Sequence, residues 1–218
     1  MDVELSKNLP PEAMPPVPPL EQVERLVSAS ARIHGHLCPG QVIGVRMSIL
    51  GLGLLGYPSP LPYPEIKNLV GVVESERCLA DAVAVASGLR FGRGSLKLIN
   101  LGLLAVSFGE ISSGRAVRLI SREKARKLAL DYVPQANNPH AAQTEAYKIR
   151  PNDELFDASW VQIKIPAYEM PGARPPKMAC EQCGVLVRSG QAVREDGRTL
   201  CPVCAGRAYF SPGAKLEL

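Results

Sequence analysis

The stretch around which this chain is organised runs from residue 34 to residue 40 and reads His-Gly-His-Leu-Cys-Pro-Gly. It holds two of the three histidines and one of the six cysteines of the chain within five positions. Neutral imidazole and thiolate are common protein ligands of zinc and related transition metals. The cluster therefore predicts one part of a metal or reactive-thiol site. The simpler alternative is a loop whose histidines only satisfy backbone groups.

The segments around this stretch predict helices that begin at the two isolated cysteines. Pro39 suits the first turn of a helix, and the apolar residues after it predict a buried helix over about 40–56, preceded by another over 21–33. A β-branched strand over 68–74 is followed by Ser75 as a candidate N-cap and an Ala- and Val-rich helix over 78–87. Cys38 and Cys78 would then lie at helix N-termini, where the helix dipole favours a thiolate.

The remaining pattern predicts an α+β fold in two parts. Strand candidates at 96–100, 103–108 and 115–120 suit an antiparallel meander, and a last strand is expected over 160–165. We expect a core domain with a mixed or antiparallel sheet and packed helices, plus a small C-terminal zinc-ribbon-like finger. The expected boundaries are a proline-rich extension over 1–19, the core over 20–165, a proline-rich linker over 166–178 and the finger over 179–218.

Four cysteines near the C-terminus form two C-x-x-C pairs, Cys180 with Cys183 and Cys201 with Cys204. This spacing is typical of a tetrahedral Cys₄ site for structural Zn²⁺. Segments 185–187 and 199–200 are expected to form a hairpin around a turn at 195–197. From residue 166 onward seven Lys or Arg oppose five Asp or Glu, and four thiolates with one Zn²⁺ add −2, so the finger is close to neutral. That charge favours a protein partner over nucleic acid.

Charge and hydrophobicity indicate which classes of protein the chain does not resemble. A net charge of +4 without blocks of like charge does not indicate a nucleic-acid-binding protein. The longest apolar stretch, over 42–57, contains Arg46 and four glycines and is too short to span a bilayer. The acidic N-terminus lacks an apolar signal segment, so we expect a cytoplasmic, thiol-reducing location.

Taken together, these motifs resemble a known family. The segment from His34 to Met47 resembles the signature of the FmdE family, named after the E component of formylmethanofuran dehydrogenase. Segments 73–82 and 92–96 look like the second and third blocks of that family, and 113–118 and 153–156 like weaker later ones. The resemblance covers about residues 20–165, with the blocks in order. The C-terminal part looks like the TraR/DksA-type C4 zinc finger.

The resemblance implies a dimeric α+β protein with a second transition metal, expected to be Zn²⁺, at a core site. Carried over, its ligands are His34, His36, Cys38 and Cys78, with Asp81 one helical turn later as an orienting group or ligand. The sequence also departs from the family: a cysteine common after the third helix is replaced by Leu89, and a lysine before the next strand by Leu103.

Three functions follow as hypotheses. The first is a metal-binding accessory or sensor protein, related to the FmdE component of a molybdenum- or tungsten-dependent formylmethanofuran dehydrogenase. The second is an enzyme with Cys38 or Cys78 as a thiolate nucleophile and a neighbouring histidine as base. The third is a transcription-related regulator that acts through its zinc finger.

Overall fold

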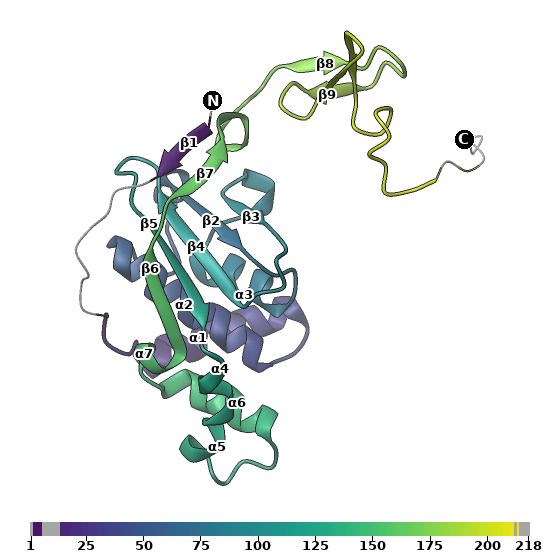
Figure 1. Ribbon diagram of the computed structural model, residues 1–218. Coiled ribbons are helices and arrows are strands. Elements are labelled where there is room, and N and C mark those ends of the chain that lie inside the picture. The colour runs from purple at the N-terminus through teal and green to yellow at the C-terminus, as the bar shows by residue number, and fades with distance from the viewer. Residues whose placement is uncertain (1, 6–13, 212, 214–218) are drawn as a thin grey trace. The chain divides into compact units, whose positions relative to one another are not determined.

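The computed structural model describes residues 2–5, 14–211 and 213, and it divides into two compact units, residues 1–172 and 173–218 (Figure 1). The boundary between the units falls inside the proline-rich segment expected to be a linker. Part of the predicted extension over 1–19, residues 1 and 6–13, lies outside the described part of the chain.

The first unit contains a five-stranded mixed sheet. Its strands are β2 (Leu69–Val73), β3 (Leu96–Leu98), β4 (Ala105–Glu110), β5 (Ala116–Ser121) and β6 (Phe156–Trp160), in the order β3-β2-β4-β5-β6. β2 and β3 are parallel, whereas every other pair is antiparallel. The predicted meander is therefore wrong at its first step, because β3 pairs with β2 and not with β4. Helix α3 (Cys78–Ser87) connects the parallel strands as a βαβ crossover.

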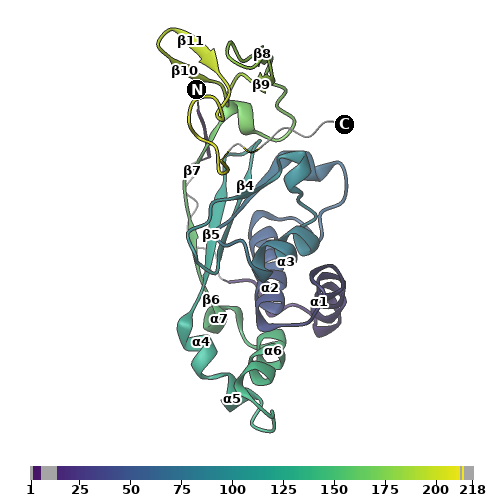
Figure 2. The same ribbon diagram turned by 90° about the vertical axis from the view of Figure 1, so that its right-hand side faces the viewer.

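Three helices cover one face of this sheet (Figure 2). They are α1 (Leu20–His34), α2 (Pro39–Leu55) and α3. α2 is buried over nearly its whole length, as its apolar composition predicts. It approaches α3 so closely that a Cβ on Gly44 would lie 2.5 Å from the Cβ of Ala82. Small residues at this crossing bring the two helix starts, and with them the two isolated cysteines, together.

The opposite face of the sheet is partly covered by the end of the first unit. Val70 and Ala116 are fully buried there against Ile165 of β7 (Ile163–Pro166). β7 pairs antiparallel with β1 (Asp2–Leu5). The predicted strand over 160–165 is thus two strands, since β6 ends at Trp160 and β7 begins three residues later.

A group of short helices lies beyond one end of the sheet (Figure 1). It comprises α4 (Glu123–Lys127), α5 (Ala129–Tyr132), α6 (Pro139–Ile149) and α7 (Asn152–Leu155). Arg46 of α2 is fully buried and reaches the end of α6, where it donates to the carbonyls of Tyr147 and Arg150 at 2.7 and 2.8 Å. Burial lowers the pKa of Arg46 to about 10, so the side chain keeps its charge at neutral pH, and the negative end of the α6 dipole compensates it.

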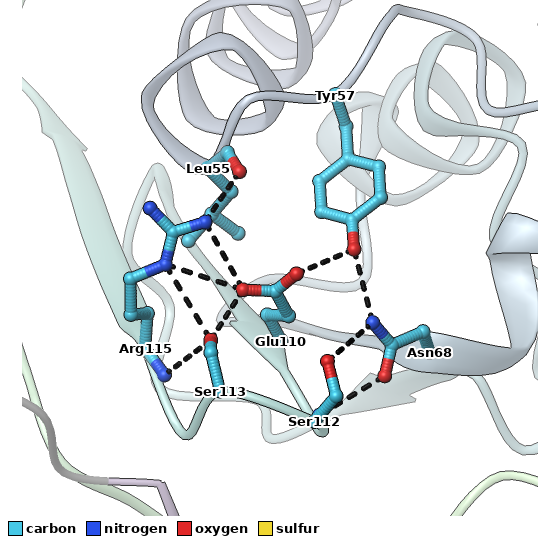
Figure 3. A network of polar contacts seen from close by, with 7 residues as sticks. All are labelled: Leu55, Tyr57, Asn68, Glu110, Ser112, Ser113 and Arg115. Atoms are coloured by element: carbon cyan, nitrogen blue, oxygen red, sulfur yellow. Dashed lines mark hydrogen bonds and ion pairs between the residues drawn. The ribbon is translucent and has the colours of Figure 1, made fainter.

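A polar network lies at the C-terminal end of α2 (Figure 3). Glu110 accepts hydrogen bonds from Tyr57 at 2.5 Å, from Arg115 at 3.0 Å and from Ser113. Arg115 also donates to the carbonyl of Leu55 at 2.7 Å. Since α2 is about 25 Å long, this network is remote from Cys38 at the other end of the helix and serves to fix α2 on the sheet.

The second unit consists of two small antiparallel hairpins. β8 (Lys177–Ala179) pairs with β9 (Leu186–Arg188), and β10 (Val193–Glu195) pairs with β11 (Arg198–Leu200). The turn at Asp196 and Gly197 lies where the sequence predicts it, but its first strand is 193–195 and not 185–187. Segment 186–188 pairs instead with a strand that precedes the first cysteine pair. The short elements bury few apolar side chains.

None of the helices in the described part of the chain is long and apolar enough to cross a membrane. The buried α2 has a mostly apolar sequence, and the sheet, α1, α3 and α6 pack around it. Its hydrophobicity is therefore explained by its central place in the core.

Candidate metal centre

The core site forms where three helix ends meet. His34 is the last residue of α1, Cys38 is the N-cap of α2, and Cys78 is the first residue of α3. The N-cap of α3 is Arg77, so the prediction of Ser75 as the cap is wrong. The chain leaves β2 and turns through residues 74–77 before the helix begins, which places Ser75 before the cap position.

His34, Cys38 and Cys78 each offer one ligand atom, and these three atoms lie within 4.8 Å of one another. Such a spacing suits three ligands of one ion, because Zn–N and Zn–S bonds are about 2.0 and 2.3 Å long. Cys38 is buried and Cys78 is half-buried. The structure therefore brings together three of the four core ligands that the resemblance implies.

The imidazole of His34 has the hydrogen-bonding pattern of a metal ligand. Its Nδ1 atom lies 2.8 Å from Oδ2 of Asp81, which matches the orienting role expected for that residue. Its Nε2 atom is buried and has no hydrogen-bond partner among the described residues. A buried ring nitrogen without a partner is costly, and an ion bound to Cys38 and Cys78 would satisfy it. The carboxylate–histidine–metal arrangement is common in zinc proteins.

His36 is placed differently from the other three candidate ligands. Gly35 ends α1 in the left-handed conformation, with φ of 93°, and this turn carries the chain away from the helix. His36 is exposed, and its ring centroid lies 4.6 Å from that of His34. It lies beside the three-residue group but is not one of its members.

Two features around the site are not predicted from the sequence. A Cβ on Gly40 would lie 2.9 Å from the Cβ of Cys78 and 3.8 Å from Sγ of Cys38, so a side chain there would enter the space between the two cysteines. Gln41 is fully buried and donates from Nε2 to the carbonyl of Cys78 at 2.8 Å, while its Oε1 accepts from Ser30 of α1. The available signal was a polar residue at the start of an otherwise apolar helix.

The electrostatic environment of Cys78 differs from that expected of a helix N-terminus. Burial raises the pKa of the Cys78 thiol, and the hydrogen bond to Cys38 and the charge of Cys38 raise it further. Two adjacent sulfurs thus favour protonated Cys78 when no cation is bound. A divalent cation would reverse this preference, because a coordinating thiol loses its proton to the metal.

The C-terminal unit holds the second group of ligands. One sulfur from each of Cys180, Cys183, Cys201 and Cys204 lies within 4.8 Å of the others. Sγ of Cys183 and Sγ of Cys201 are 3.9 Å apart, close to the separation of about 3.8 Å that tetrahedral Zn–S bonds of 2.3 Å require. Gly184, with φ of 74°, turns the chain directly after the first pair.

Backbone amides stabilise the thiolate form at one of these cysteines. The backbone at Cys201, together with that at Cys183 and Gln182, lowers the pKa of Cys180 to about 6, although burial acts in the opposite direction. Hydrogen bonding to Cys183, with burial, raises the pKa of Cys204 to about 12. These shifts favour a thiolate at Cys180 and a protonated thiol at Cys204 when no cation is bound. As at Cys78, a divalent cation would replace these protons and bind all four as thiolates.

Comparison with known protein families identifies one that matches most of the first unit. Residues 33–157 match the family described as "FmdE, Molybdenum formylmethanofuran dehydrogenase operon". A curated relative from Archaeoglobus fulgidus, named "Probable S-adenosyl-L-methionine-binding protein", is 29% identical over 211 residues, which cover 89% of this chain and 56% of the relative. The chain thus spans about half the length of that relative, and the relative's name describes the whole of that protein.

A solved structure shares the fold. It is the crystal structure of a "tungsten formylmethanofuran dehydrogenase subunit e (fmde)-like protein" from Syntrophus aciditrophicus, with a TM-score of 0.56 and 20% sequence identity, covering 87% of this chain and 95% of the other. The family match includes His34, Cys38 and Cys78. Because it extends over more than half of the 218 residues, the chain belongs to the FmdE family.

Proposed function

We propose that this chain is a metal-binding accessory or sensor protein with two metal centres. The core centre binds one transition metal ion, Zn²⁺, through Nε2 of His34 and the sulfurs of Cys38 and Cys78. The four cysteines of the second unit bind a structural Zn²⁺ as a TraR/DksA-type zinc finger. Two observations carry the proposal: one ligand atom from each of His34, Cys38 and Cys78 converges from three helices, and Nε2 of His34 is buried without a partner among the described residues.

The composition of the core centre supports a site with an open position. Zn²⁺ takes four ligands, and one imidazole with two thiolates leaves one position for water or another molecule. In such a position the ion supplies Lewis-acid chemistry to whatever binds there. Two thiolates neutralise the charge of the ion, so the complete centre would carry no net charge. The exposed His36 lies beside His34, with 4.6 Å between the two ring centroids.

The departure from the family at Leu89 is compatible with metal binding at the core centre. Leu89, which replaces the family cysteine, is fully buried and packs against Gly71. The contact is so close that a Cβ on Gly71 would lie 2.7 Å from Cδ1 of Leu89. It follows the C-terminal end of α3, whereas Cys78 begins that helix, and ten helical residues span about 15 Å. The missing cysteine therefore does not belong to the core centre, and its loss leaves the three ligands intact.

Metal analysis of the full chain tests the proposal. Purified wild-type protein should contain about two equivalents of metal per chain, while Cys38→Ser and Cys183→Ser should each contain about one. Circular dichroism of the core would show whether Cys38→Ser remains folded. The proposal fails if the wild type contains a single equivalent and Cys38→Ser contains the same amount.

The thiolate-enzyme alternative makes a different prediction. A nucleophilic cysteine reacts at neutral pH much faster than an ordinary thiol, because its pKa is lowered. The raised pKa of Cys78 opposes that role for this residue. Alkylation of metal-free protein, followed residue by residue with mass spectrometry, should show no thiol in the core that reacts faster than free cysteine. A single hyper-reactive Cys38 would favour the enzyme instead.

A further inference from the structure

Gln41 is a buried amide whose hydrogen bonds lead to the helices that carry the core ligands. It is the third residue of α2 and none of its surface is exposed. Its backbone N–H donates to the carbonyl of Cys38 at 3.0 Å. Its side-chain Nε2 donates to the carbonyl of Cys78 at 2.8 Å, and its Oε1 accepts from the hydroxyl of Ser30. One residue is thereby bonded to α1, α2 and α3.

The partner on α1 is well placed to transmit this contact to the third ligand. Ser30 is fully buried and lies four residues before His34, so the two side chains share one face of α1. The hydrogen bond from Ser30 to Gln41 fixes the position of that face relative to the start of α2. The Asp81 contact then sets the rotation of the His34 ring itself.

Where the two cysteine-bearing helices begin, their separation depends on a close backbone approach as well as on the packing of small residues further along α2 and α3. Gly40, which lies between Cys38 and Gln41 in the first turn, has no side chain, and a Cβ there would lie 2.9 Å from the Cβ of Cys78. The first turns of α2 and α3 therefore approach at this point without a side chain from Gly40 between them. The hydrogen bond from Gln41 to the carbonyl of Cys78 is the directional contact that holds them in register.

Burial of an amide at this position needs an explanation that packing does not supply. α2 is otherwise composed mostly of apolar and small residues, and an apolar side chain of similar volume would fill the same space without a desolvation cost. We propose that Gln41 is a positioning residue for the core metal: its amide sets the spacing of the Cys38 and Cys78 sulfurs and the approach of His34. This inference rests on the proposed core centre.

Variants of the full chain separate the contacts of Gln41. Gln41→Met keeps the volume but loses both side-chain hydrogen bonds, Gln41→Glu keeps the acceptor for Ser30 but loses the donor to Cys78, and Ser30→Ala removes only the contact to α1. Ser48→Ala is the matched control, because Ser48 is equally buried in α2 and donates to the carbonyl of Gly44, at 2.9 Å, within its own helix. Cys38→Ser removes a proposed ligand and shows how much of the metal content and of the cobalt spectrum comes from the core centre.

Two measurements are made on each variant. Zn²⁺ affinity is obtained by competition with a chromophoric chelator, and Co²⁺ titration reports the number of thiolate ligands and their geometry through the sulfur-to-cobalt and ligand-field bands. We expect Gln41→Met and Gln41→Glu to bind Zn²⁺ at the core centre about 10- to 100-fold more weakly, with altered ligand-field bands. Ser30→Ala should lower the Zn²⁺ affinity and alter the ligand-field bands to a smaller extent. Ser48→Ala should leave the affinity and the bands unchanged.

The outcomes distinguish this inference from the proposed centre. If Cys38→Ser leaves the metal content and the cobalt spectrum unchanged, the core centre itself does not exist. If Cys38→Ser removes one equivalent but Gln41→Met retains wild-type affinity and spectrum, the centre stands and the role of Gln41 is refuted. Should Gln41→Met fail to fold, Gln41→Glu and Ser30→Ala decide the question, and wild-type spectra for both would refute the role.

Discussion

The Nδ1 atom of His34 and the Oδ2 atom of Asp81 lie 2.8 Å apart, across the junction of α1 and α3. The contact leaves Nε2 as the ring atom available to a cation, and that atom is buried without another partner among the described residues. It also links the proposed ligand at the end of α1 to a carboxylate one turn into the helix that begins with Cys78. Orientation of the imidazole is thus part of the folded core.

Replacing Asp81 with Asn should weaken metal binding at the core centre. The amide cannot stabilise the imidazole as the carboxylate does, and affinity should fall about 10- to 100-fold. Chelator competition on the full chain measures the change. Glu76→Gln is the matched control, because Glu76 is an exposed acid two residues before Cys78. Equal affinities for wild type and Asp81→Asn would contradict the orienting role.

Gly40→Ala should disturb the same centre by geometry alone. The added Cβ would lie 2.9 Å from the Cβ of Cys78, a separation that forces the helix starts apart. Metal occupancy at the core should fall while the four-cysteine centre stays loaded. Gly53→Ala, in the same helix but with nothing within 4 Å of the added Cβ, should leave metal content unchanged and raise stability by up to about 1 kcal/mol. Full occupancy in Gly40→Ala would show that the two helices can separate without loss of the site.

The network around Glu110 predicts a pH-dependent contribution to stability. Burial raises the pKa of Glu110, but hydrogen bonds from Ser113, Tyr57 and Arg115 outweigh it, and the folded-state pKa lies below the ordinary value of 4.5. A carboxyl group with a lowered pKa stabilises the fold above its unfolded-state pKa, and this contribution is lost as the pH falls through the folded-state pKa. Glu110→Gln should therefore cost about 1–3 kcal/mol at pH 7 and less at pH 3.

Urea unfolding at both pH values measures this difference. The exposed Glu65→Gln serves as the control and should stay within about 0.5 kcal/mol of wild type at either pH. A cost for Glu110→Gln that is the same at pH 7 and pH 3 would show that the charge of the carboxylate does not contribute.

Removal of metal should unfold the second unit and leave the first one folded. The buried cluster of residues 173–218, within the part that the structure describes, consists of Cys180, Leu200 and Cys201, so two of its three members are proposed ligands. A unit with so small a core needs its ion to fold. With a strong chelator, amide NMR signals from this unit should collapse to disordered positions, whereas those of the sheet persist. Persistence of the dispersed signals of β10 and β11 in metal-free protein would contradict this.

The helices and the cysteine pairs could be predicted because their signals are local. Pro39 and Gly56 bracket α2, and Gly88 follows α3, in agreement with the expected positions. The pairing of β3 could not be predicted as easily, because neighbouring strands in sequence suggested a hairpin with β4. The order strand, helix, strand over 69–98 was the available signal, since such a unit favours a parallel crossover.

The candidate site was only partly predictable, because sequence signals are local and the site also depends on contacts between distant segments. Spacing identified the histidines and cysteines, but it could not separate His34 from His36, because the distinction depends on the left-handed turn at Gly35. The role of Gln41 depends on contacts with residues 11 and 37 positions away in the sequence. Helical periodicity carries no information about such long-range contacts. The unpaired Nε2 atom of His34 is likewise a property of the packed structure, as far as the described residues show it.

The most direct test is to locate the ions in crystals of the full chain by anomalous scattering on both sides of the zinc absorption edge. Two peaks are expected in each chain, one among the four cysteine sulfurs and one bonded to Nε2 of His34 and to the sulfurs of Cys38 and Cys78, at about 2.0 and 2.3 Å. A crystal with an ion only in the second unit, and with those two sulfurs bound to nothing, would contradict the proposed core centre.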